Sequence, residues 1–342
     1  MELDNELIKQ IKITPIIESL KLEDIDDKVY FSAKYKNYIS NSRLGLLKSK
    51  GAKAFFEGIK SDGYNYSFDF GGNLHSLYLQ NESYELINSV YKPTAKAGLM
   101  ADFLYKRDGT TPTDDEIKSA SYVIGYYKDK LTTNRLKEFR EKSEPYWRDR
   151  FIYEQNNLKE DKIRIYTDEK SVNLLNSCLE SINNDINFQK LIHPDYIVDE
   201  PYSANERTIL LDIEAEIPGY DKRIYKLKAK LDNFTIDKES NVITVNDLKT
   251  TSKLAKEFDP SYFSYQRELA GYSWLLKLCS KKFFGLDNPE IKGNFLVVST
   301  IPDYNTLVYP MTKKLWKSGW NEYSYLLKTV IYLNIVKGFE FK

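Results

Sequence analysis

The sequence predicts an α/β (α+β) fold in which a mixed sheet is flanked by helices. Residues 207–250 read as three consecutive strands, because runs rich in β-branched residues are separated by turn residues at 218–219 and 237–241. Helices are predicted over 261–279 and 313–336, and two strand-like runs, 294–300 and 306–310, lie between them. An antiparallel meander followed by a helix, more strands and a helix is typical of a mixed α/β core.

The chain before these strands differs in character. Residues 1–27 contain eight acidic residues and three lysines, so we expect an acidic, partly helical arm over 1–37. The next helix is predicted to begin at Ser40 or Ser42, because a serine hydroxyl is a favourable helix cap. Residues 94–200 are mainly polar, helical in pattern and punctuated by prolines. We therefore expect one domain over 38–342 with a helical insertion around 94–200.

Composition limits the chemistry available to the chain. The 50 Lys and Arg residues balance the 50 Asp and Glu residues, which argues against a uniformly basic coat for nucleic acid. Two cysteines, Cys178 and Cys279, cannot build a disulfide scaffold or a cysteine-rich zinc site. With only two histidines, His75 and His193, carboxylates and lysines must carry any chemistry, and we expect His193 to be structural or exposed.

The sequence also predicts a location for the protein. No apolar run approaches the roughly 20 residues that a membrane-spanning helix needs. The first ten residues are acidic and lack the basic start and apolar centre of a signal peptide. Together with the low cysteine content, these features lead us to expect a cytoplasmic protein with no membrane partner.

One acid and one lysine interrupt an apolar row near the end of the third strand. Residues two apart on a strand share a face, so Asp247 and Lys249 continue the row formed by Ile243 and Val245. Asp232 stands near the end of the preceding strand. An ion pair or a frayed strand end would explain an arbitrary Asp-x-Lys tripeptide.

A divalent-metal site is the sharper interpretation of the same residues. Mg²⁺ takes oxygen ligands, so Asp232 and Asp247 are predicted to converge on one ion, with the Leu248 carbonyl as a further ligand. Lys249 would orient or deprotonate a water molecule and offset phosphate charge. Mn²⁺ suits the same ligands.

These residues resemble the PD-(D/E)xK nuclease superfamily, and most closely its phage RecE-like and lambda-exonuclease-like branch. The resemblance starts from Asp232 followed by Asp247-Leu248-Lys249 on the next strand. Four further segments occur in the matching order, namely YISNSRLGLL (38–47), GGNLH (71–75), SYQRELAGY (264–272) and NFLVVSTIPDYNTLVYPMTKKLWKSGWNEYSYLL (294–327). The resemblance implies a restriction-endonuclease-like sheet.

The resemblance also implies roles for further residues. His75 would join the metal site, and Gln266 and Tyr272 would contact DNA, although Ala270 stands where a tyrosine often follows the glutamine. An acid on the first strand sometimes supports such sites, and the candidates left open are Asp212, Glu214 and Glu216.

The function implied is a Mg²⁺- or Mn²⁺-dependent DNA exonuclease that hydrolyses duplex ends in phage or bacterial recombination or repair. The alternatives are an endonuclease with the same metal site and a catalytically silent DNA-binding or scaffold protein. A homo-oligomer, and an annealing protein as partner, are implied by resemblance only. Residues 221–256 and 277–342 carry net charges of +4 and +5, which favours binding to a phosphate backbone near the site.

Overall fold

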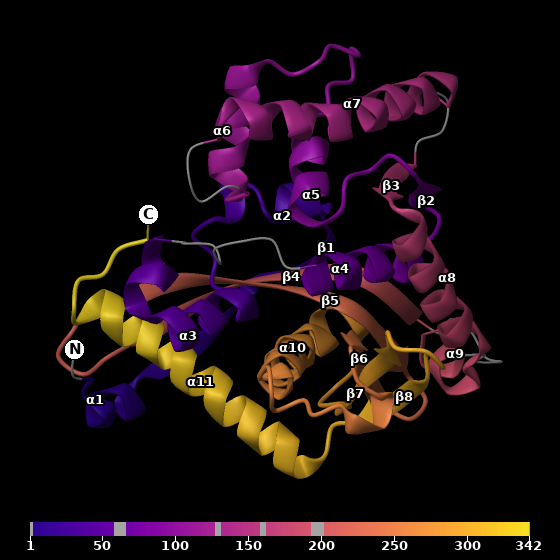
Figure 1. Ribbon diagram of the computed structural model, residues 1–342. Coiled ribbons are helices and arrows are strands. Elements are labelled where there is room, and N and C mark those ends of the chain that lie inside the picture. The colour runs from indigo at the N-terminus through magenta and orange to yellow at the C-terminus, as the bar shows by residue number, and fades with distance from the viewer. Residues whose placement is uncertain (1–2, 58–65, 127–130, 158–161, 193–201, 342) are drawn as a thin grey trace. The chain divides into compact units, whose positions relative to one another are not determined.

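The computed structural model describes residues 3–57, 66–126, 131–157, 162–192 and 202–341 (Figure 1). His193 lies outside the described residues. The chain divides into two compact units. The first, here called the sheet unit, comprises residues up to 60 and from 182 onward, and the second, the insert unit, comprises residues 61–181.

A six-stranded mixed sheet forms the centre of the sheet unit. Its order is β1-β4-β5-β6-β7-β8, and every neighbouring pair is antiparallel except β6 and β7, which are parallel. The antiparallel strands β4, β5 and β6 form the predicted meander. The strands are β1 (Lys12–Asp24), β4 (Tyr202–Glu216), β5 (Arg223–Asp237), β6 (Val242–Thr251), β7 (Glu290–Ser299) and β8 (Thr306–Pro310).

Two long helices, α10 (Tyr265–Cys279) and α11 (Lys313–Ile335), lie side by side in the sheet unit (Figure 1). Their close approach depends on glycine, because a Cβ on Gly319 would lie 2.1 Å from the Gln266 carbonyl oxygen. The remaining helices are α1 (Asn5–Gln10), α2 (Asp27–Tyr30), α3 (Asn41–Glu57) and α9 (Ile186–Ile192), with short 3₁₀ or π turns η1 (Ala33–Tyr35), η2 (Ala255–Glu257) and η3 (Ser280–Phe284). Helix α3 packs against α11, so helices α3, α10 and α11 share the large apolar core with the sheet.

The insert unit is mainly helical and has its own apolar core around Met100, Ile117 and Tyr146. It contains a small parallel sheet, which the sequence did not reveal, because β2 (Tyr84–Asn88) pairs with β3 (Ile163–Thr167). Its helices are α4 (Tyr66–Leu79), α5 (Ala95–Leu104), α6 (Asp114–Ile124), α7 (Thr133–Asn156) and α8 (Glu169–Asn184), the last of which ends three residues beyond the unit.

The predicted fold class is confirmed, since helices flank a mixed sheet and the strands of the meander lie where the sequence placed them. Within the N-terminal segment, residues 12–24 form β1, which pairs with β4 across a register shift between Ile16 and Lys21. The insert unit comprises residues 61–181, and the domain boundaries expected from the sequence stay a prediction. No described helix combines the length and apolar character required to cross a lipid bilayer.

Candidate active site

The site lies where two neighbouring strands of the sheet unit separate. Strands β5 and β6 pair over five residues, ending at Asn233 opposite Asn246. Beyond that pair, β6 continues along β7 to Thr251, whereas β5 continues along β4. Asp232 and Asp247 are the first residues past the last pair, so both carboxylates stand at the opening between the strands.

The carboxylate of Asp232 binds the backbone of β6 at this opening. The backbone N–H of Leu248 donates a hydrogen bond of 2.8 Å to Oδ2 of Asp232. A side chain thus satisfies an amide of β6 beyond the end of its pairing with β5. Asp232 therefore contacts the backbone next to Asp247, and the convergence of Asp232, Asp247 and the Leu248 carbonyl on one ion stays a prediction.

Lys249 lies half-buried among acidic side chains. Its Nζ is 2.8 Å from Oδ2 of Asp247 and 3.5 Å from Oε2 of Glu268 on α10. Burial alone lowers the pKa of Lys249, but the carboxylates of Asp247, Glu268 and Asp232 raise it well above its ordinary value. The ammonium group therefore keeps its charge at neutral pH.

Asp247 is the most buried acid of this group. Its residue is 1% exposed, and Oδ2 forms an ion pair with the Lys249 ammonium at 2.8 Å. Burial raises the pKa of its carboxyl, Lys249 opposes the rise, and Asp232 and Glu268 add to it. A buried carboxylate is costly unless charged partners or a bound cation stabilise it.

A third strand contributes a carboxylate that the sequence did not reveal. The register of β4 and β5 places Glu206 opposite Asp232, since Asn205 pairs with Asn233 and Arg207 with Leu231. A carboxylate oxygen of Glu206 lies within 4.8 Å of one of Asp232. The strand predicted from the sequence begins at residue 207, directly after Glu206, so the prediction does not include this carboxylate.

Glu206 is held by a lysine on the neighbouring strand. Nζ of Lys230 lies 3.0 Å from Oε2 of Glu206 and also bonds the Asp27 carboxylate of α2. Glu206 adopts a left-handed backbone conformation with φ of 54°, which is uncommon for a residue with a side chain. Local strain of this kind is concentrated at functional sites.

A ladder of asparagines fixes the register of these strands. Asn233 donates to Asn205, Asn246 donates to Asn233, and Asn294 donates to Asn246, at 2.7, 2.8 and 3.0 Å. The four residues belong to β4, β5, β6 and β7 and are register partners. Because successive side chains alternate between faces, the ladder lies on the opposite face from Glu206, Asp232 and Asp247, its immediate neighbours in sequence.

Helix α10 contributes Glu268, which the sequence did not indicate, and the role of Gln266 in binding DNA stays a prediction. Gln266 is 4% exposed and packs beside α11, and its Oε1 has no hydrogen-bond partner among the described residues. Glu268 contacts Lys249 and accepts a hydrogen bond of 2.8 Å from the hydroxyl of Tyr272, four residues later. Ala270 stands four residues after Gln266, where a tyrosine was expected, whereas Tyr272 stands four residues after Glu268.

The other acids suggested on the first strand lie in surface ion pairs. Asp212 is 3.3 Å from Lys226, and Lys222 is 2.8 Å from Glu214 and 3.8 Å from Glu216. His75 belongs to α4 of the insert unit, and its role as a ligand stays a prediction.

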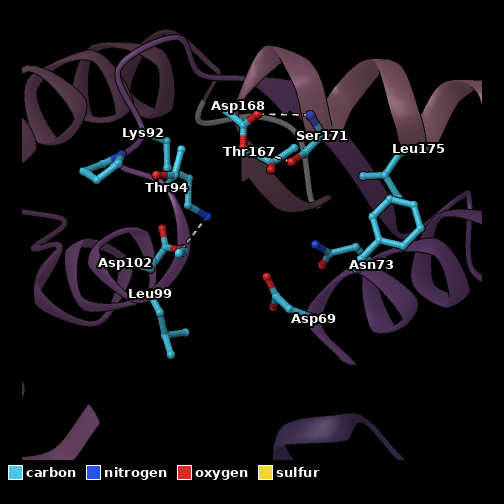
Figure 2. Close-up of a pocket in the computed structure, with 13 residues that line it drawn as sticks. Asp69, Asn73, Lys92, Thr94, Leu99, Asp102, Thr167, Asp168, Ser171 and Leu175 are labelled. Carbon is cyan, nitrogen blue, oxygen red and sulfur yellow. Dashed lines mark hydrogen bonds and ion pairs between the residues drawn. The ribbon is translucent and has the colours of Figure 1, made fainter. Parts of the chain in front are cut away.

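The insert unit has a small pocket of its own, about 50 Å³ in volume (Figure 2). Lys92 lies on one side, 2.6 Å from Oδ2 of Asp102, and donates to the Tyr166 carbonyl. Asp168 faces the same space and accepts hydrogen bonds from Ser171 at the start of α8. Ligand sites usually measure 300–1,000 Å³, so this pocket is too small for a nucleotide.

Comparisons with known proteins leave the chain without an assigned family. No family model matches the sequence, and no curated protein matches it. Among solved structures, it is similar to the crystal structure of "Putative exonuclease" from Eubacterium rectale, with a TM-score of 0.37 and 12% identity. The similarity covers 91% of this chain and 86% of that one. A similarity of this size assigns neither fold nor function.

Proposed function

We propose that the protein is a metal-dependent DNA nuclease that acts on duplex ends. The observation that carries the proposal is the row of three carboxylates, Glu206, Asp232 and Asp247, on three neighbouring strands beside the half-buried Lys249. The PD-(D/E)xK resemblance of the sequence supports the same chemistry.

The charges of the site suit a divalent cation. Four carboxyl groups, of Glu206, Asp232, Asp247 and Glu268, lie beside only two ammonium groups, from Lys230 and Lys249, and burial among these acids raises the pKa of Asp247. Oxygen donors of this type fit Mg²⁺ or Mn²⁺, and Oδ2 of the buried Asp247 has the Lys249 ammonium beside it at 2.8 Å. The residues present therefore fit the ion that the resemblance implies.

Each residue has a part that follows from its environment. Asp232 and Asp247 would hold the ion, with Glu206 as a third carboxylate and His75 as the auxiliary ligand that resemblance suggests. A bound ion would lower the pKa of a water molecule and polarise the phosphate. Lys249 would offset phosphate charge and orient or deprotonate the water molecule, as its position beside Asp247 suggests. Glu268 and Tyr272 would fix the position of Lys249.

The decisive experiment compares linear and circular duplex DNA in the presence of Mg²⁺. An exonuclease degrades only the linear form, an endonuclease also cuts the circle, and a silent binding protein cuts neither. Asp247→Asn, which keeps the shape of the side chain, is expected to reduce cleavage by roughly a hundredfold or more.

Asp212→Asn is the matched control, because Asp212 lies on β4 in an ion pair with Lys226 away from the row. It should cleave as the wild type does. Full activity of Asp247→Asn would refute the site, and absence of cleavage by the wild type with Mg²⁺ and with Mn²⁺ would refute the nuclease. A homo-oligomer and an annealing partner stay predictions.

A further inference from the structure

Two large aromatic side chains project into solvent in the turn before α10. Tyr262 is 78% exposed and Phe263 is 62% exposed, and their ring centroids are 4.6 Å apart in an edge-to-face arrangement. Isolated exposed aromatics are common and need no explanation. This pair differs because further aromatic rings connect it with Lys249.

A continuous series of ring contacts connects the pair with the candidate active site. The ring of Phe263 is 5.5 Å from that of Tyr265, and the Tyr265 ring lies 5.0 Å from Nζ of Lys249. Tyr265 also stacks on Phe258, with centroids 5.8 Å apart, and Phe258 contacts Phe295, the register partner of Asp247 on β7. Phe263 is therefore two side-chain contacts from the lysine of the site, and Tyr262 is three.

Hydrogen bonds hold this turn in one conformation. Asp259 accepts from the backbone N–H and the hydroxyl of Ser261, and the N–H of Tyr265 donates to the Pro260 carbonyl. Ser264 adopts a left-handed backbone with φ of 59°, and its hydroxyl accepts a hydrogen bond of 2.8 Å from Lys48 of α3. These bonds fix the backbone from which the two rings project, so binding would have to order only their side chains.

We propose that Tyr262 and Phe263 form a stacking platform for the terminal bases of a DNA strand whose phosphate lies at the carboxylate row. The proposal rests on the proposed nuclease function and adds the element that recognises an end. A duplex end exposes the face of a base, and aromatic side chains bind such faces without regard to sequence. Phe263 is connected to Lys249 through Tyr265, and this position near a cation favours a nucleobase over an apolar protein partner.

The test measures DNA binding by the full chain in EDTA, so that the DNA stays intact. The probes are blunt duplexes with 2-aminopurine at the 5′ or the 3′ terminal position, and a closed circular duplex of the same length without ends competes for binding. The double variant Tyr262→Ala/Phe263→Ala is expected to bind the open duplexes roughly tenfold to a hundredfold more weakly. It should also lose the change in 2-aminopurine fluorescence, while its affinity for the circle is unchanged.

Tyr122→Ala is the matched control, since Tyr122 is 89% exposed on α6 of the insert unit. It should bind as the wild type does. Wild-type affinity and fluorescence in the double variant would overturn the platform, as would a change only in its sedimentation, which would indicate a protein interface. If end binding depends on the two rings but no metal supports cleavage, the platform stands and the nuclease proposal fails. If the double variant binds normally and the wild type cleaves, the reverse holds.

Discussion

Replacing Asn246 by leucine tests whether the asparagine ladder holds the sheet together at the site. Asn246 donates to Oδ1 of Asn233 and to the Leu191 carbonyl, at 2.8 and 3.2 Å, and accepts from Asn294 at 3.0 Å. Leucine has a similar volume but makes none of these bonds. Three polar groups would consequently lose their partner in the folded state.

The size of the effect follows from the burial of those groups. Asn233 is completely buried, so its stranded oxygen should cost about 1–3 kcal/mol. Asn294 and Leu191 are partly exposed and can recover water, so each should cost about 0.5–1 kcal/mol. The total is about 2–5 kcal/mol, a large part of the roughly 5–15 kcal/mol that keeps a domain folded.

Urea unfolding followed by tryptophan fluorescence measures this loss in the sheet unit, which contains Trp274, Trp316 and Trp320 of the four tryptophans. Asn187→Leu on the surface of α9 is the control and should change stability by about 0.5 kcal/mol at most. A double variant that also carries Asn233→Leu should lose less than the sum of the two single losses, because both stranded partners are removed together.

An unfolding midpoint for Asn246→Leu that equals the wild-type value would refute the ladder as a stabilising element. Strict additivity in the double variant would refute the direct coupling of Asn233 and Asn246. A stable Asn246→Leu protein that cleaves DNA at the wild-type rate would show that the ladder does not position the carboxylates on the opposite face.

Two further predictions concern the sheet unit. Burial lowers the pKa of Lys228 to about 8. Between about pH 8 and 10.5 the folded state therefore binds fewer protons than the unfolded state. Below pH 8 the buried ammonium destabilises the folded state in full, and this destabilisation is lost as the pH rises. The free energy of unfolding of Lys228→Met, relative to that of the wild type, should therefore be about 2 kcal/mol higher at pH 7 than at pH 10. A difference in urea unfolding that does not change with pH would contradict this. Gly319→Ala would place a Cβ 2.1 Å from the Gln266 carbonyl oxygen and should destabilise the α10–α11 contact by about 1–3 kcal/mol, seen as a lower melting temperature, whereas Gly72→Ala, whose Cβ meets nothing within 4 Å, should not.

The sequence was sufficient wherever a single strand or helix determined the answer. Period-two alternation placed Asp247 and Lys249 on one face, and their atoms lie 2.8 Å apart. The meander and the two long helices were equally accessible, because turn residues and apolar periodicity are local signals.

The sequence was insufficient where a residue depends on pairing between distant strands. Glu206 is identified as a neighbour of Asp232 only by the register of β4 on β5. Extending the predicted first strand until it matched the second in length would have included Glu206. Glu268 and Gln266 are two residues apart on one helix, so periodicity alone could not decide which of them faces Lys249. That choice depends on the packing of α10 between α11 and the sheet.

The two faces of the central strands explain why the candidate site is where it is. On one face, Asn205, Asn233 and Asn246 satisfy one another, so that face is neutral and needs no ligand. On the other, the residues adjacent in sequence are acids that two lysines balance only in part. The buried hydrogen bonds between the asparagines align strands that bring three carboxylates close together. The repulsion between these carboxylates destabilises the fold locally, and the fold itself does not require it. Departures of this kind are concentrated at functional sites, and a divalent cation is the group that would relieve this one.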